Sequence, residues 1–132
     1  MSVKSFQIGS LTVNAAMPTA LEQDEVLSLM GSDLIQRAAI MARNGEEVGE
    51  SMLTAMFISM PTHIKHRVAS ILLSKAAMAG TSTPVSVADF QGKMVQYNTL
   101  LAQLTVWNFD DFFIWLGDAV KQSAPAQVTT AP

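Results

Sequence analysis

The sequence contains no cysteine among its 132 residues, and this absence excludes several kinds of chemistry. Disulfide bonds, thiolate metal sites and thiol nucleophiles all depend on cysteine side chains. A chain without cysteine is compatible with a reducing compartment, where proteins are not stabilised by disulfide bonds. The composition therefore favours a cytoplasmic protein without thiol chemistry.

Charged residues are also scarce, at 14% of the chain against about 25% in typical soluble domains. The formal net charge is −3, and an acidic surface repels the phosphate backbone of nucleic acids. The two longest stretches without a charge, residues 5–21 and 94–109, are both shorter than the roughly 20 apolar residues of a membrane helix, and both include Gln and Asn. We therefore expect neither nucleic-acid binding nor a membrane span.

Residues that carry catalysis or bind metals are few. His63 and His66 have a spacing that can place two imidazoles on one metal ion, but no third ligand is nearby and their neighbours are basic. Asp110 and Asp111 are consecutive, so on a helix they point about 100° apart and suit the first turn of that helix. The sequence also lacks a nucleophile elbow and a glycine-rich phosphate loop. We expect no catalytic, cofactor or metal site, and a protein that is not an enzyme.

Hydrophobic residues, in contrast, make up 49% of the chain, and their pattern near the N-terminus predicts a β-hairpin over about residues 5–14. Gly9 and Ser10 form the predicted two-residue turn, since a glycine at the first position supplies the positive φ of a type II′ turn. The resulting register places four apolar residues on one face: Phe6, Ile8, Leu11 and Val13. This face must cover a helix or a partner, because an isolated hairpin is only marginally stable.

The rest of the chain has helical periodicity. Thr19 and Glu22 have the spacing of a capping box, and Gly31 predicts a boundary between one helix that ends near residue 30 and a second over residues 32–43. The further predicted helices cover residues 46–60, 62–78, 87–106 and 109–121, with a second capping box at residues 86–89 and a break at Asn108. These patterns predict a single mainly α domain over residues 1–122, a compact bundle of about five to six helices preceded by the small hairpin.

The last ten residues, 123–132, differ from the rest of the chain. They have no charge, few large apolar groups and two prolines. This composition predicts a disordered C-terminal tail.

Five of the nine aromatic residues lie within nine positions of each other: Trp107, Phe109, Phe112, Phe113 and Trp115. On a helix they cover more than one face, which leaves two interpretations open. One is an unusually aromatic core helix, and the other is a surface that binds a partner or a second copy of the chain. A membrane-surface helix is disfavoured because the neighbouring charges are aspartates, which anionic lipids repel.

Methionine is the second unusual feature, with nine residues in the chain. Met52, Met56 and Met60 recur at i, i+4 and i+8 and form one flexible apolar ridge on a predicted helix. Methionine fills cores and is also frequent on surfaces that accept varied partners, so both interpretations stay open. The ridge and the aromatic cluster together form the set of candidate partner-binding residues.

The order of these elements resembles the tail assembly chaperones of long-tailed bacteriophages over about residues 5–121. A hairpin (SFQIGSLTVNAAMP) leads into an acidic-capped helix (TALEQDEVLSLM), and a helical body, an aromatic helix (VWNFDDFFIWLGDAV) and an Ala/Pro/Thr tail follow. The resemblance implies a non-enzymatic helical protein that acts in the cytoplasm of the infected host and is absent from the mature virion. It also implies self-association.

The same resemblance implies two partners. Members of the family keep the hydrophobic tape measure protein soluble and help to recruit tail-tube subunits onto it, and many are extended by a programmed frameshift near the C-terminus. Under this hypothesis, Trp107, Phe112 and Trp115 anchor a partner helix while Met52 and Met56 adapt to it. The alternative is a minor phage structural or adaptor protein that stays in the particle as an oligomer.

Overall fold

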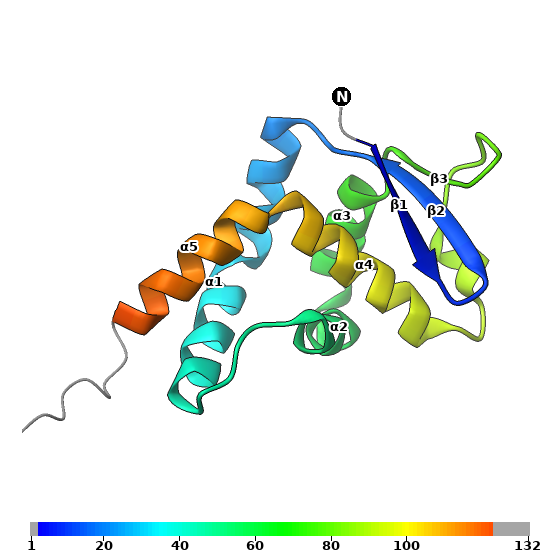
Figure 1. The fold of residues 1–132 in the computed structure, drawn as a ribbon. Coiled ribbons are helices and arrows are strands. Elements are labelled where there is room, and N and C mark those ends of the chain that lie inside the picture. Colours follow the sequence, from blue (N-terminus) through cyan, green and yellow to red (C-terminus); the bar gives the residue numbers. More distant parts are fainter. Residues whose placement is uncertain (1–2, 123–132) are drawn as a thin grey trace, which may run out of the picture.

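The computed structural model describes residues 3–122, with side chains described as far as residue 119. The fold is mainly α, with a small antiparallel sheet at one end and the pair α1 and α5 at the other (Figure 1). The elements are β1 (Val3–Ile8), β2 (Leu11–Ala16), α1 (Ala20–Arg43), α2 (Glu50–Ser59), α3 (Thr62–Leu72), β3 (Ala76–Met78), the short 3₁₀ helix η1 (Val87–Phe90), α4 (Met94–Asn108) and α5 (Asp110–Gln122). The predicted tail, residues 123–132, lies outside the described residues.

The N-terminal hairpin has the predicted register. Phe6 lies opposite Val13 and Ile8 lies opposite Leu11 in the antiparallel pair β1–β2. Gly9 adopts a φ of +60°, as the two-residue turn requires. Of the four apolar side chains, three are buried and Leu11 is partly buried against the core, so this face of the hairpin covers the helical body.

A third strand, β3, was not expected from the sequence. The helix predicted over residues 62–78 ends at Leu72, and Ala76 and Met78 instead pair with Ala15 and Val13 of β2. Alanine and methionine favour helices in isolation, so the local sequence conceals this strand. The free edge of β2 overrides that preference because it offers backbone hydrogen-bond partners to the passing chain.

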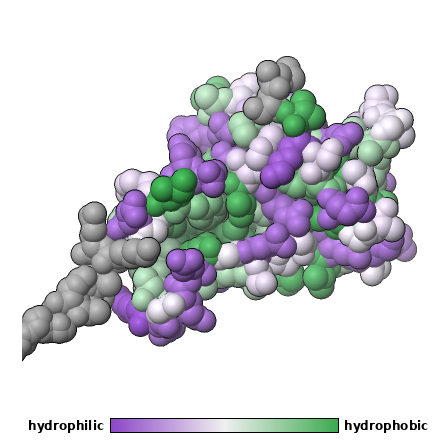
Figure 2. Space-filling view, in the orientation of Figure 1, coloured by the Kyte–Doolittle hydropathy of each residue, from purple (hydrophilic) through white to green (hydrophobic). Residues whose placement is uncertain are grey.

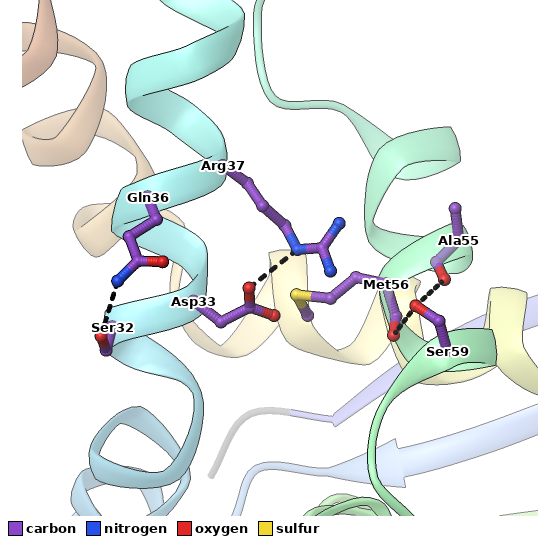
Figure 3. A network of polar contacts seen from close by, with 7 residues as sticks. All are labelled: Ser32, Asp33, Gln36, Arg37, Ala55, Met56 and Ser59. Atoms are coloured by element: carbon purple, nitrogen blue, oxygen red, sulfur yellow. Dashed lines mark hydrogen bonds and ion pairs between the residues drawn. The ribbon is translucent and has the colours of Figure 1, made fainter.

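Helix α1 is continuous, so the boundary predicted at Gly31 is wrong. Its N-terminus has the predicted capping box, in which Thr19 Oγ1 accepts from the Glu22 amide and the Glu22 carboxylate accepts from the Thr19 amide. The helix passes through Gly31 because its buried stripe keeps the same four-residue spacing on both sides: Val26, Met30, Leu34 and Ala38. Ser32 does not cap a new helix; its hydroxyl accepts a 3.5 Å hydrogen bond from Gln36 in the next turn (Figure 3).

Two other helices begin later than predicted. Helix α2 starts at Glu50, and residues 46–49 are an irregular connection, because Gly49 takes an extended conformation and precedes the first helical turn. The capping box at residues 86–89 is present, but it starts the 3₁₀ helix η1 and not the long helix. Gly92 then adopts a φ of +78°, and α4 begins at Met94.

Helix α4 lies at the centre of the domain. Eight of its residues are buried, and α2, α3, β1 and η1 all pack against it: the buried residues are Tyr97, Asn98, Leu100, Leu101, Ala102, Leu104, Thr105 and Asn108. This burial accounts for the absence of charge at these eight positions. Within the described part of the chain, no helix combines the length and apolar character needed to cross a membrane.

Candidate functional site

The junction between α4 and α5 fixes the direction of α5. The predicted break at Asn108 is confirmed, since α4 ends at this residue and α5 begins at Asp110. The Asn108 side chain donates a 2.9 Å hydrogen bond to the Leu104 carbonyl and accepts a 2.9 Å hydrogen bond from the Gln23 amide of α1. The junction is therefore held both by its own helix and by α1.

The aromatic cluster divides between the core and the surface. Phe109 is buried, Phe112 and Phe113 are partly buried against the core, and Trp107 packs edge-on against the Phe6 ring with a centroid distance of 5.6 Å. These residues belong to the domain interior or its margin. Phe109 is thus a core residue, and the core interpretation applies to the buried members of the cluster.

The outward face of α5 carries the exposed members. Ile114 is 62% exposed and Trp115 is 56% exposed, although both side chains are large and apolar. Trp115 lies 5.9 Å from the Phe112 ring, which in turn lies 5.5 Å from the Phe113 ring, measured between centroids. The contact with Phe112 favours this orientation of Trp115 at the surface, because aromatic pairs prefer defined tilted or edge-to-face geometries.

Beside this face, a groove of about 510 Å³ separates α5 from the C-terminal half of α1. Its lining comes from three segments: Ala38 and Ala42 of α1, residues 45–48, and Phe113, Ile114, Leu116, Gly117 and Asp118 of α5. The volume is within the range of about 300–1,000 Å³ that is typical of ligand pockets. Figure 2 shows a hydrophobic hollow beside α5 that hydrophilic residues border.

Two buried residues of the groove lie outside the main core cluster, although Val48 and Phe113 of its lining pack against that cluster. Leu116 and Ala38 are 2% and 3% exposed, yet neither belongs to the contiguous core cluster that α4 organises. They are buried where α1 and α5 approach each other. Sequence reasoning missed Ala38, Ala42 and Val48 as site residues, because small or isolated aliphatic residues give no signal for binding until the fold brings them together.

The methionine ridge does not join this site. Met56 is fully buried in α2, where it belongs to the core and is unavailable to a partner. Met52 and Met60 are partly buried against the same core, and Met60 lies beyond the end of α2 in an extended conformation. None of the three lines the groove. A buried methionine at this position acts as a core filler, one of the two interpretations that the sequence left open.

The other candidates from the sequence lie at the surface. His63 and His66 are exposed on α3, and the described residues contain no group of three His, Asp or Glu side chains that could hold a metal ion. Asp110 and Asp111 are exposed in the first turn of α5, where carboxylates interact favourably with the helix dipole. A second hollow of about 780 Å³ lies between β1, the start of α2 and α4, and is mixed in polarity.

Comparisons with protein-family models, with curated proteins and with solved structures give no match to this chain. A function must therefore be inferred from the described residues themselves. The most distinctive arrangement among them is an anchored helix, α5, that presents Ile114 and Trp115 beside an apolar groove.

Proposed function

We propose that this protein is a tail assembly chaperone of a long-tailed bacteriophage. It binds the hydrophobic tape measure protein, helps to recruit tail-tube subunits onto it, and performs no catalysis. It acts in the cytoplasm of the infected bacterium and leaves before the virion matures. The identity of the partners comes from the resemblance of the sequence to this family. The binding surface in the proposal is the outward face of α5.

The observation that carries this proposal is the exposure of Ile114 and Trp115 on a helix that is otherwise well anchored. Full burial of such a side chain is worth about 1.5–3 kcal/mol, and only the fraction still exposed remains to be gained on binding. Two such residues beside an open apolar groove give a moderate affinity, which suits a partner that must later be released.

The geometry suits an amphipathic helix as the bound form of the partner. A helix laid along α5 buries its apolar stripe against Ile114 and Trp115, and one of its side chains enters the groove beside Leu116. The apolar face of the tape measure helix is then shielded from other tape measure chains. This shielding keeps the partner soluble until the tail tube assembles around it.

Co-expression with a tape measure segment tests the proposal. We expect the wild-type chain to increase the soluble fraction of the segment, and Ile114→Ala to reduce that increase. Ile58→Ala is the matched control, because Ile58 is 52% exposed on α2 and lines neither hollow. Equal solubility with and without the wild-type chain would refute the proposal, and finding the protein in purified virions would favour a retained structural component.

A further inference from the structure

The charged residues at the rim of the groove beside α5 are all acidic. Glu46 and Glu47 border it on the side of the irregular segment, and Asp118 borders it on α5, while no basic residue is part of the lining. On the outward face of α5, Asp111 and Asp118 lie one turn before Ile114 and one turn after it. The exposed apolar residues are therefore enclosed between carboxylates on the helix and beside it.

These carboxylates have no cationic partner within the described side chains. The ion pairs found there join Arg37 to Asp33 along α1, with a 3.0 Å Nε–Oδ1 distance (Figure 3), and Arg67 to Glu25 between α3 and α1. Neither pair involves the acids of the groove. Arg43, in the last turn of α1, is exposed and is not part of the lining. Among the described side chains, no ion pair therefore offsets the negative charge of the acidic rim.

From this arrangement we propose that the groove selects a basic amphipathic helix, in which lysine or arginine side chains flank the apolar stripe. This inference rests on the proposed function and defines the chemistry of the segment that the chaperone binds. The apolar stripe covers Ile114 and Trp115, and the flanking cations reach Asp111 and Asp118 at the two ends of the contact and Glu46 and Glu47 beside it. Attraction between the rim carboxylates and these cations then gives basic helices a higher affinity than other apolar helices, which would otherwise bind the groove equally well.

A second copy of this chain fits the groove less well than a separate partner. The most basic part of the sequence is residues 61–80, but Arg67 is already paired with Glu25, and Lys65 is partly buried with its ammonium 5.9 Å from the Tyr97 ring centroid. Lys75 alone remains as an exposed cation there. The occupant is therefore a helix of another protein.

Two synthetic peptides of about 18 residues, long enough to form a helix, test this selection. Both have the same leucine stripe, and one has lysine at the flanking positions where the other has glutamate. Exposed ion pairs each change affinity by a factor of about 1.5 to 5, so two to four of them at an intermediate factor of about 3 favour the lysine peptide by roughly 10- to 80-fold. Raising the salt concentration from about 0.05 to 0.5 M narrows that preference, since it shortens the screening length.

The variant Glu46→Gln/Glu47→Gln/Asp111→Asn/Asp118→Asn removes all four of these carboxylates, which lie at exposed positions. We expect it to bind both peptides alike while keeping the wild-type circular dichroism spectrum. The variant Asp33→Asn is the control and keeps the preference, because Asp33 lies outside the groove. Equal binding of both peptides to the wild-type chain would overturn this inference and leave the proposed function intact. If the wild-type chain binds neither peptide and also fails to solubilise the tape measure segment, both this inference and the proposed function are overturned.

Discussion

The side-chain amide of Gln23 on α1 donates a 2.9 Å hydrogen bond to Asn108 Oδ1 at the end of α4. These residues are 85 positions apart in the sequence, and their contact ties the start of α1 to the point where the chain turns into α5. Because α5 carries the exposed apolar face, this bond helps to set the position of the proposed binding surface.

Replacing Gln23 with alanine tests this link. We expect Gln23→Ala to lower the free energy of unfolding by about 1 kcal/mol, since a partly buried hydrogen bond is lost and the Asn108 oxygen is left without its partner. Gln36→Ala, on the same helix, removes only an exposed 3.5 Å bond to Ser32 and should change stability by less than about 0.5 kcal/mol. Equal effects of the two changes in urea unfolding would contradict the assigned role of Gln23.

Two glycines should respond in opposite directions to alanine. Gly9 has a φ of +60°, and an added Cβ would lie 2.7 Å from the Gln96 Nε2 atom, so Gly9→Ala should destabilise the protein by about 1–2 kcal/mol. Gly31 is inside α1, and an added Cβ there meets nothing within 4 Å, so Gly31→Ala should stabilise by about 0.5–1 kcal/mol. Thermal unfolding of both variants measures these changes in stability. If Gly31→Ala destabilised the protein, helix α1 would depend on a break at this position.

Alanine substitutions should distinguish the buried from the exposed members of the candidate partner-binding residues by the loss in free energy of unfolding that each one causes. Met56 is fully buried, so Met56→Ala should cost about 2–5 kcal/mol through lost burial and a residual cavity. Trp115 is 56% exposed, so Trp115→Ala should cost less than about 1 kcal/mol, mostly from the lost contact with Phe112. Denaturant titration distinguishes the two, and a large loss for Trp115→Ala would place this side chain in the core.

Acid should weaken the contacts at the start of α1. A hydrogen bond from Arg67 lowers the pKa of Glu25 below its ordinary value of 4.5, and one from the Thr19 backbone does the same to the pKa of Glu22. A carboxyl group with a lowered folded-state pKa contributes stability that is present above pH 4.5 and is lost as the pH falls through the lowered value. We therefore expect the free energy of unfolding to decline below about pH 4.5, and to decline less steeply in Glu25→Gln.

Arg67→Gln provides the companion measurement for the same ion pair. It should flatten the acid decline at least as much as Glu25→Gln does, because it removes the same ion pair and also the charge of Arg67 that helps to lower the pKa of Glu22. An unchanged slope in both variants would show that this pair does not contribute to the acid sensitivity.

The features that the sequence predicted well are those fixed by neighbouring residues. The hairpin register follows from Gly9 and the alternation around it, and the cap of α1 follows from the three-residue spacing of Thr19 and Glu22. The break at Asn108 was also visible locally, because the helical pattern is too long for one helix.

The features that the sequence did not predict depend on distant contacts. Strand β3 forms only because the edge of β2 is free to pair with Ala76 and Met78. The same limit applies to the site: helical periodicity does not show which part of the aromatic cluster faces α1. Only the docking of α5 buries Leu116 and leaves Trp115 outside, and only the approach of α1 creates the groove.

The fluorescence of Trp115 tests the central claim most directly, because this side chain lies in the proposed binding surface. Trp107→Phe leaves Trp115 as the sole tryptophan and keeps an aromatic ring against Phe6. We predict that a peptide from the apolar part of a tape measure protein shifts the emission to shorter wavelength and protects it from iodide quenching, and that Ile114→Ala weakens the binding measured in this way. Unchanged emission and quenching at peptide concentrations that saturate binding would contradict the account.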